Sequence, residues 1–470
     1  MTLLQDRPLD GAHASAPSIT EQVDRLPFGT AEKAQRYATG RFLGAAGLNW
    51  YRADPSLQFL MRYYLTPAEL DWADPFLVGL GALIGGPVAE RAALTDKNPP
   101  RLVKYDRWGH DISEVVIPET ARESKRDLLA QRFANPAIQE EAQRAGVRLT
   151  LPGAAYSYML NQAEIGMSCA LGTGLDMIQN LVNRFAPPDV RDWVMPKLLS
   201  GEWTGETAQM LTERTGGSDL GALETTATPE GDAWRLNGFK WFASNADGQA
   251  FVVLAKPLGA PDSVRGICSF LVLKERRDGG RNGVRIRQLK EKLGTRVVAS
   301  CEIEFDDAEA FILSDAPAAG AGGDGRGLAR MMEMTNGSRL GVAMMGLGCA
   351  RRALVESLCY ASARAAFGRR LIDPPLLRRK LAELIVDVEA AQALVFDGYG
   401  VANHQQESGE PARLRLGAPL IKLRAARLGI TAASDAIEIH GGNGYVDTWP
   451  VARILRDAQV NTVWEGADNI

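Results

Sequence analysis

The hydrophobic period of this chain changes twice, and this change constrains the fold more than any other feature. From about residue 61 to 204, apolar residues recur at helical spacing, as in LTPAELDWADPFLVGLGALIG. From 205 to 318 the pattern is two-fold and β-branched, as in QAFVVLAKP. After a glycine-rich joint, Gly320–Gly327, helical spacing returns. The order predicts an α+β protein with an N-terminal α-helical domain, a middle antiparallel β domain and a C-terminal α-helical bundle.

Local signals refine these boundaries. We expect residues 1–60 to form an extended arm, followed by domains at 61–204, 205–318 and 325–470. Thr66 is a predicted N-cap, with Pro67 at the first helical position and Glu69 closing a capping box. The Asn-Gly pair in Leu236–Phe239 predicts a tight hairpin turn.

Composition excludes several classes of protein. A length of 470 residues predicts two or three domains, and a formal charge of −4 gives no general attraction to nucleic acid or anionic membrane. The 5 cysteines are widely spaced without C-x-x-C, which is typical of reduced thiols in a cytoplasmic protein. The N-terminus lacks the apolar run of a secretory signal. The stretch PFLVGLGALIGGPVAE is too short and glycine-rich to span a bilayer, so no membrane partner is expected.

Two glycine patterns resemble a dinucleotide fingerprint but favour helix packing. GLGALIG, Gly79–Gly85, has no preceding strand and the wrong spacing, and GLGCAR, Gly346–Arg351, lies inside a helical run. The 4 histidines are scattered, so no metal site is predicted, and no G-x-S-x-G elbow is present.

Four other stretches have two readings each. The loop QMLTERTGGSDLGA, Gln209–Ala222, is either a phosphate-binding loop or an ordinary Gly-Gly turn. The strand GFKWFASNAD suits either a flat ring ligand or a hydrophobic core. Arg364 in ARAAFGRRL and the Gly441–Gly444 turn in IHGGNGYVDTWP are either phosphate contacts or a solvated face and a helix cap. The residues alone leave these readings open.

Taken together, these stretches resemble the acyl-CoA dehydrogenase superfamily from about residue 65 onward. MLTERTGGSD is similar to its LTEPxxGSD segment, KWFASNA to its flavin-contacting strand, and RAAFG to its R-x-x-F-G. HGGNGY is similar to its GGxGY turn, and RDAQVNTVWEG to the RDA…IYEG stretch that holds the catalytic glutamate. The tryptophan before that glutamate, the N-terminal arm and NPPRLVKYDRWGHD look most like the AidB-like branch.

The resemblance implies an FAD protein, usually a homotetramer, and assigns roles to individual residues. Glu465 would be the catalytic base, and Arg339 would contact the substrate. The implied cofactor contacts are Met210, Leu211, Thr212, Gly217, Ser218, Phe242, Ser244, Arg364, Phe367, Gly441, Gly442, Gly444, Trp464 and Asn469. Of these, Arg364, Phe367 and the three glycines after residue 440 would reach the FAD of a neighbouring subunit.

The chain departs from the family pattern at several positions. Leu377 replaces a glutamine that binds FAD in many relatives, and Ala467 replaces a threonine two residues after the base. Asn336 stands where many relatives carry an acid, which bears on acyl-CoA recognition. The family continues past the position matched by Ile470, and the AidB-like branch adds a basic domain there, so we expect a chain that is either incomplete or short.

The expected function is α,β-dehydrogenation of an acyl-CoA thioester, with Glu465 as base and flavin as hydride acceptor. Reoxidation by an electron-transfer flavoprotein is implied by the resemblance. The alternative is an AidB-like flavoprotein associated with DNA and the alkylation response, with little dehydrogenase activity. Its basic clusters would be Ala350–Arg352, Gly368–Arg370 and Arg378–Lys380.

Overall fold

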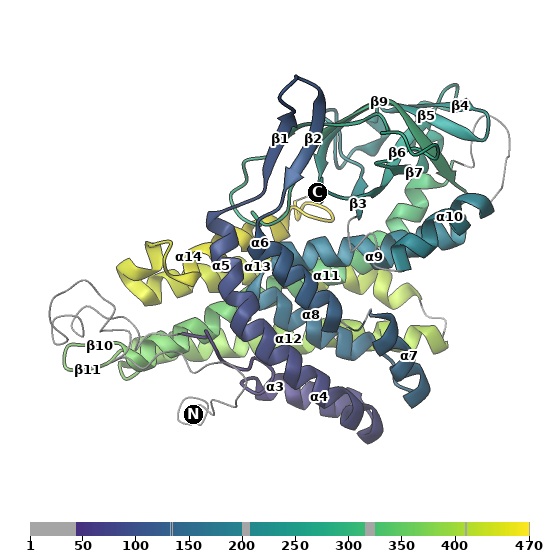
Figure 1. The fold of residues 1–470 in the computed structure, drawn as a ribbon. Coiled ribbons are helices and arrows are strands. Elements are labelled where there is room, and N and C mark those ends of the chain that lie inside the picture. Colours follow the sequence, from purple (N-terminus) through teal and green to yellow (C-terminus); the bar gives the residue numbers. More distant parts are fainter. Residues whose placement is uncertain are drawn as a thin grey trace.

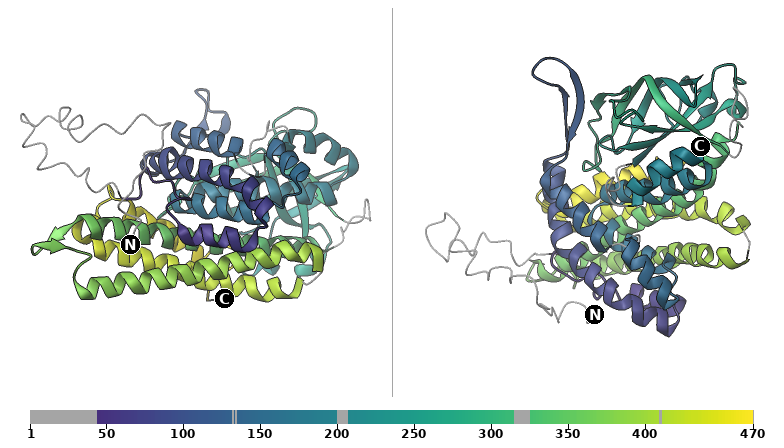
Figure 2. Two further views of the ribbon diagram at one scale, coloured as in Figure 1. Left: turned by 90° about the horizontal axis from the view of Figure 1, so that it is seen from below. Right: turned by 45° about the vertical axis from the view of Figure 1, so that its right-hand side comes forward.

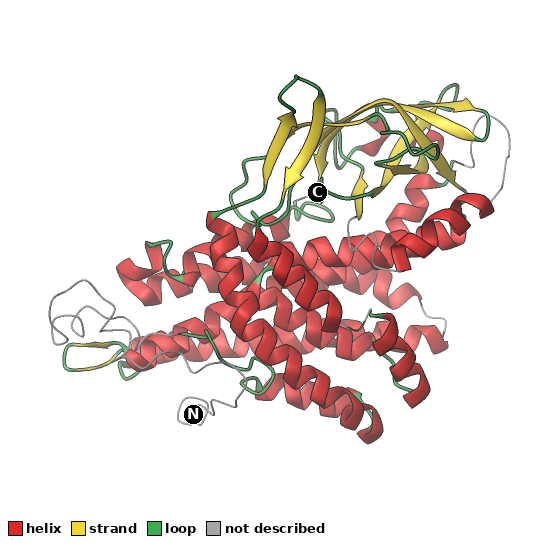
Figure 3. Ribbon diagram, in the orientation of Figure 1, coloured by secondary structure: helices red, strands yellow, loops and turns green. Residues whose placement is uncertain are grey.

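The structure, a computed structural model, describes residues 44–131, 133, 135–199, 207–314, 325–408 and 411–469. Its elements follow the predicted order of helices, strands and helices (Figures 1 and 3). The N-terminal part contains α3 (Pro55–Tyr64), α4 (Pro67–Leu83), the π-helical turn η2 (Ile84–Val88), α5 (Ala89–Lys97), β1 (Arg101–Tyr105), β2 (Asp111–Val116), α6 (Glu119–Gln131), α7 (Pro136–Ala145), α8 (Thr150–Ala163), α9 (Ile165–Phe185) and α10 (Pro188–Leu199). The middle part contains β3 (Thr207–Met210), β4 (Thr226–Glu230), β5 (Ala233–Ala243), β6 (Ala250–Pro257), β7 (Cys268–Leu273), β8 (Val284–Leu289) and β9 (Cys301–Leu313). The C-terminal part contains α11 (Gly327–Ala363), the short strands β10 (Ala365–Ala366) and β11 (Arg369–Arg370), α12 (Pro375–Ser408), α13 (Pro411–His440) and α14 (Pro450–Ala458).

The described part of the predicted arm is not extended, which corrects that expectation. Residues 44–54 form turns that bury Trp50 and Tyr51, and α3 already begins at Pro55. These turns cross α4 at its glycines, and a Cβ on Gly81 would lie 2.7 Å from the Tyr51 amide nitrogen. Gly81 and Gly85 of GLGALIG therefore serve close packing, as predicted, whereas Gly79 faces open space. Residues 1–43 of the arm lie outside the described residues.

The predicted capping box at the start of α4 is present, with Thr66 and Glu69 exchanging hydrogen bonds. The helical run then continues through η2 and α5. Among the described helices, this run, Pro67–Lys97, is long and apolar enough to cross a membrane by length and composition alone. The helical run is therefore longer than the stretch PFLVGLGALIGGPVAE, which was expected to be too short to span a bilayer. Its inner side chains Leu77, Leu80 and Ile84 are fully buried in the helical core, as in the core helix of a folded domain.

The middle domain is a seven-stranded sheet that closes on itself. Strand β6 pairs with β4, β4 with β5, β5 with β9, β9 with β7, and β7 with β6 again, while β3 adds to β6 and β8 to β9. Most pairings are antiparallel, as predicted, but β6 is parallel to both β3 and β4. The sheet is therefore mixed. The sequence predicted a purely antiparallel sheet. The alternation of residues along a strand does not encode which strands pair, so the parallel partners of β6 were not predicted.

The predicted hairpin turn at Leu236–Phe239 is wrong. These residues lie inside the single long strand β5, whose register against β9 shifts between Leu236 and Gly238. Gly238 has φ 156°, and a Cβ there would lie 2.7 Å from the Cα of Thr225. The glycine thus allows a bulge where the neighbouring backbone approaches closely, which is the other common use of glycine in a strand.

The long C-terminal helices form the predicted bundle. Figure 2 shows α11, α12 and α13, coloured green to yellow, lying side by side. Gly346 of α11 lies against the backbone of α13 at Ala425, and Gly348 lies against Asn161 of α8. GLGCAR is therefore a packing motif, as predicted. Of the predicted joint, the residues up to 324 lie outside the described residues, and α11 begins at Gly327.

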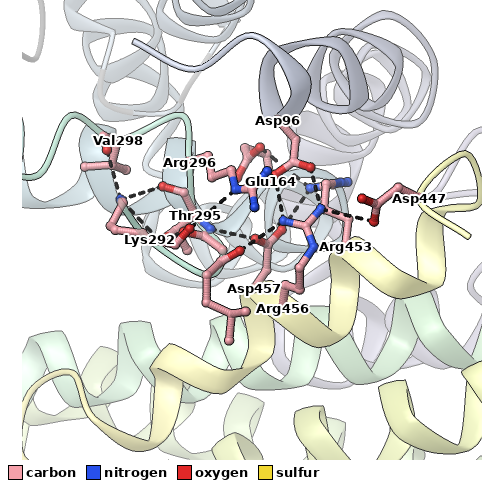
Figure 4. A network of polar contacts seen from close by, with 12 residues as sticks. Asp96, Glu164, Lys292, Thr295, Arg296, Val298, Asp447, Arg453, Arg456 and Asp457 are labelled. Atoms are coloured by element: carbon pink, nitrogen blue, oxygen red, sulfur yellow. Dashed lines mark hydrogen bonds and ion pairs between the residues drawn. The ribbon is translucent and has the colours of Figure 1, made fainter. Parts of the chain in front are cut away.

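A buried polar cluster joins the three parts of the molecule (Figure 4). Arg456 of α14 forms an ion pair with Asp96 of α5 and donates to the carbonyl of Leu293, in the loop between β8 and β9. Asp457 accepts from the backbone N–H of Thr295 at 2.6 Å. Since each contact crosses a domain boundary, the cluster fixes how the β domain sits on the helices.

Candidate active site

The C-terminal segment after α14 turns back at Glu465. Glu465 has φ 54° and Gly466 has φ 104°, and a positive φ is rare for a glutamate. Polar contacts hold this backbone in place. The Arg339 guanidinium donates to the Glu465 carbonyl at 3.1 Å, and the Lys422 ammonium donates to the Gly466 carbonyl at 2.7 Å. These contacts fix the backbone of the turn and therefore the direction in which the Glu465 side chain leaves it.

Asp468 completes the anchor of this segment. Its side chain is only 2% exposed and forms ion pairs with Lys422 at 2.8 Å and Arg427 at 2.9 Å, both from α13. Asp468 also closes the turn, because its N–H donates to the carbonyl of Thr462 at 3.0 Å. The bundle therefore grips the segment on both sides of Glu465. Asn469, a predicted cofactor contact, is exposed beside this anchor.

The Glu465 carboxylate points toward the β domain. Gln209, in β3, donates its side-chain N–H to Glu465 Oε1 at 3.1 Å. Burial raises the pKa of Glu465, while the Gln209 hydrogen bond and the charges of Arg339 and Lys422 oppose this rise without cancelling it. Trp464 beside it is partly buried and packs against the helical core. A carboxylate with a raised pKa, held at a domain boundary, can act as a general base.

The end of β3 and the loop after it carry five predicted cofactor contacts. Met210 is buried at the end of β3, Leu211 and Thr212 are partly buried, and Gly217 and Ser218 are exposed. The loop is fixed to β5, since the Trp241 N–H donates to the Thr212 carbonyl at 2.9 Å. The structure thus brings these residues together and leaves the glycine-serine backbone accessible, as a phosphate-binding loop requires.

A buried ion pair between β5 and this loop holds the loop in place. The Lys240 ammonium lies 2.6 Å from Glu213 Oε1, and both side chains are almost fully buried. Glu213 also accepts from the N–H of Glu224 and from the hydroxyl of Thr225. Burial alone would raise the pKa of Glu213, but the charge and hydrogen bond of Lys240 bring it below its ordinary value. Glu213 is therefore a charged structural residue within the loop.

Phe242 and Ser244 lie at the end of β5, next to this loop. The Phe242 ring is 53% exposed, which is unusual for a phenylalanine on a strand of a closed sheet. The Ser244 hydroxyl lies 3.4 Å from that of Ser300. Asn245 donates to the Thr207 carbonyl at 3.0 Å, so β3 runs alongside the end of β5. An exposed ring and a hydroxyl thus lie at the end of β5 that runs alongside β3, the strand that carries Gln209.

The remaining predicted contacts lie at the other end of the bundle. Arg364 follows α11 and is exposed, and Phe367 sits at the tip of the β10–β11 hairpin, fully exposed with φ 52°. The Gly441–Tyr445 turn follows α13, with Gly441 and Gly442 exposed and Gly444 buried. Asn443 links this turn to α11 by donating to the Tyr360 hydroxyl at 3.1 Å.

Figure 1 shows this hairpin and the C-terminal segment at separate places on the chain, so one chain does not bring the two groups together. The resemblance assigned Arg364, Phe367 and the turn to a neighbour's cofactor, and that role stays a prediction. Leu377, at the position of a family glutamine, packs among apolar residues next to Leu381. The side chain of Asn336 lies outside the described residues.

The predicted basic stripe does not form one surface. Arg351 and Arg352 are buried, where they form ion pairs with Asp54 and Glu356. In the exposed clusters, several cations lie close to acids, as Arg370 does to Asp373, Arg379 to Glu383 and Lys380 to Asp435. Among the described residues, the three clusters therefore do not form one continuous basic surface.

Sequence reasoning missed Gln209 and the Lys422–Asp468 anchor. Gln209 was inside the singled-out loop, but a glutamine before an apolar strand end carries no signal of its own. Asp468 is three residues after Glu465, and a charged residue at that spacing gives no hint of its partner on α13.

Comparisons with known proteins identify the family of this chain. Residues 44–204 match the description "Adaptive response protein AidB N-terminal domain". Residues 208–308 match the acyl-CoA dehydrogenase middle domain, and residues 325–470 match its C-terminal domain.

Relatives and solved structures extend the match over most of the chain. "Putative acyl-CoA dehydrogenase AidB" of Escherichia coli is 31% identical over 412 residues, covering 85% of this chain and 73% of that protein. An acyl-CoA dehydrogenase of Bacillus subtilis is 31% identical over 386 residues, or 82% of this chain and 90% of that protein. The structure of Bd2924 in its apo form has a TM-score of 0.81 at 30% identity, covering 91% of this chain and 85% of that one. Caenorhabditis elegans ACDH-11 in complex with C11-CoA has a TM-score of 0.79 at 26% identity, covering 91% and 72%. The chain therefore belongs to the acyl-CoA dehydrogenase family, with an N-terminal domain of the AidB type.

Proposed function

We propose that this chain is an FAD-dependent acyl-CoA dehydrogenase in which Glu465 removes the α-proton of an acyl-CoA thioester. The observation that carries the proposal is the built position of Glu465. Its backbone is held in a rare conformation, its carboxylate is oriented by Gln209, and burial raises its pKa. A family that acts on acyl-CoA and a carboxylate prepared as a base together favour this reaction over a purely structural role.

The residues present suit FAD. Gly217 and Ser218 are exposed residues whose backbone could approach the pyrophosphate, and the exposed Phe242 ring offers an apolar surface for a flat ring. The Ser244 hydroxyl adds a polar group at the same edge. FAD, when bound, supplies the acceptor for the β-hydrogen, which leaves as hydride.

The chain's own residues would perform the rest of the reaction. An ordinary glutamate with a pKa of about 4.3 is a weak base for a carbon acid, so a raised pKa improves proton transfer. The Glu465 carboxylate takes the α-proton while the electron pair of that C–H bond forms the double bond to the β-carbon. Gln209 keeps the carboxylate oriented, and Trp464 limits the access of water.

The proposal extends to a homotetramer in the cytoplasm, with acyl-CoA as substrate and an electron-transfer flavoprotein as acceptor. The oligomer is supported by large apolar side chains exposed on the outer faces of the bundle helices. The most exposed are Leu376, Val386, Leu416 and Leu420. The family resemblance assigns Arg339 to the substrate. Its contact with the Glu465 carbonyl supports a role in orienting the base.

The direct test is flavin bleaching. The purified protein is loaded with FAD and mixed without oxygen with acyl-CoA thioesters of graded length, including the eleven-carbon thioester bound by the nematode relative. We expect at least one thioester to bleach the flavin absorption band in a single turnover. If FAD is bound with full occupancy and no thioester in the series bleaches it, the proposal is wrong.

A further inference from the structure

Lys292 lies in the loop between β8 and β9. Its contact with Ser300 brings it near Ser244, the residue that follows β5. Its ammonium is surrounded by oxygen acceptors (Figure 4). It donates to the carbonyls of Thr295 at 2.7 Å and Val298 at 2.9 Å, and to the Ser300 hydroxyl at 3.2 Å. The Thr295 hydroxyl lies 3.4 Å away as a fourth acceptor. An ammonium has three N–H donors and no acceptor, so these partners use its full capacity. The arrangement is therefore built for the charged form of the lysine.

The contacts of Lys292 leave one directed chain of hydrogen bonds available. Because Lys292 can only donate, Ser300 accepts from it and keeps its own O–H for another partner. The Ser244 hydroxyl lies 3.4 Å from Ser300 and can accept that hydrogen. The O–H of Ser244 is then left to donate at the end of β5, beside the exposed ring of Phe242. The chain Lys292–Ser300–Ser244 thus starts at a cation and ends at a donor.

The charge at Lys292 has no direct partner to neutralise it. No carboxylate forms an ion pair with Lys292 within the described ranges, and the nearby Glu164 and Asp457 are both paired with Arg453. Burial lowers the pKa of Lys292 to about 8, while Cys169, Glu164 and Asp457 oppose this fall. Most of the lysine is therefore charged at neutral pH, in a setting where bulk water screens it poorly.

We propose that Lys292, acting through Ser300, makes Ser244 a polarised hydrogen-bond donor toward an acceptor atom of the flavin ring and thereby stabilises negative charge on the reduced ring. Lys292 and Ser300 are positioning residues, since neither is the group that touches the cofactor. The inference rests on the proposed function only for the presence of FAD. It does not depend on which substrate reduces the flavin.

The test is a redox equilibrium that needs no acyl-CoA. FAD-loaded wild type and variants are reduced without oxygen in the presence of a reference dye, and the ratio of reduced to oxidised flavin is read at a fixed dye ratio. Lys292→Met keeps the length of the side chain but removes its charge. We expect the ratio of reduced to oxidised flavin to fall by about tenfold, the factor given by ~1.4 kcal/mol of charge interaction.

Ser300→Ala separates the hydrogen-bond chain from the charge alone, because it keeps Lys292 and removes only the link. It should lower the ratio in the same direction, and it decides the question by itself if Lys292→Met does not fold. Lys104→Met is the matched control, because Lys104 is paired with Asp111 of the β1–β2 hairpin and contacts no residue assigned to the cofactor. That control should leave the ratio unchanged.

The outcomes are distinct. An unchanged ratio in Ser300→Ala overturns the inference, whatever Lys292→Met shows, since the charge would then act without the chain. A protein that binds no FAD overturns both this inference and the proposed function. If FAD binds and the dye equilibria shift as expected, but no acyl-CoA bleaches the flavin, the inference stands while the proposed function fails.

Discussion

At the scale of single residues, Glu465 is the most informative position. A non-glycine residue at positive φ costs on the order of 1–3 kcal/mol and persists only where its surroundings enforce it. Here Arg339 and Lys422 bind the carbonyls on either side of the turn, and Gln209 holds the side chain. Strain of this kind, in a carboxylate whose pKa is raised by burial, is typical of a functional site rather than of a chain end.

Gln209→Leu tests the orientation of the base. The variant removes a hydrogen bond that favours the charged carboxylate, so the pKa of Glu465 should rise further. Proton removal needs the carboxylate form, which is lost as pH falls through this pKa. The acid limb of the rate of flavin reduction by acyl-CoA should therefore move to higher pH than in wild type.

The readout is a stopped-flow series across pH with FAD content checked at each point. Gln288→Leu is the control, since Gln288 bonds Glu302 on β9 and has no contact with Glu465. An acid limb that stays in place in Gln209→Leu, with FAD fully bound, would show that Gln209 does not tune the base.

At the scale of elements, periodicity and capping predicted the three-part order and the start of α4, because these depend on local sequence. Pairing did not follow from the sequence. The parallel partners of β6 are set by contacts between distant segments, and Gly238 serves a bulge against Thr225 instead of a turn. Likewise, the flavin-loop motif could be recognised, but its support by Lys240 could not, because a lysine on an alternating strand predicts a solvent-facing side chain.

Lys240→Met tests that support. The change leaves Glu213 buried without its counter-charge, which typically costs about 3–5 kcal/mol. The melting temperature should fall by several degrees. FAD should also dissociate more readily, because the ion pair that holds the loop around Thr212 in place is lost. Adding Glu213→Gln to the same chain should recover part of both losses. Unchanged melting and FAD retention in the single variant would mean that the ion pair does not hold the loop.

At the scale of the whole molecule, the predicted site residues fall into two groups. Residues on β3, β5 and the C-terminal segment meet, while Arg364, Phe367 and the Gly441–Gly444 turn lie at another end of the bundle (Figure 1). The sequence could name both groups through the family resemblance, but neither composition nor periodicity indicates which chain each group serves. An assembly in which the second group reaches a neighbour's cofactor would give these exposed residues a function.

Arg364→Glu tests this assembly. If Arg364 binds a neighbour's FAD phosphate, reversing its charge should weaken FAD retention and reduce the oligomer size on gel filtration, because a ligand bound between subunits stabilises them by mass action. Arg379→Glu is a suitable control, since Arg379 is exposed on α12 and pairs with Glu383 within its own helix. A monomeric wild type with full FAD occupancy would contradict the shared cofactor site.

The central claim is that Glu465 is the base, and Glu465→Gln tests it most directly. The amide keeps the size of the side chain but cannot take the α-proton, so FAD content and melting temperature should stay close to wild type. The measurement is the single-turnover rate of flavin bleaching by the thioester that reduces wild type fastest, with the exposed Glu291→Gln as control. We predict a rate lower by about 10²–10⁴-fold in Glu465→Gln and an unchanged rate in the control. A Glu465→Gln protein that bleaches as fast as wild type would contradict the account.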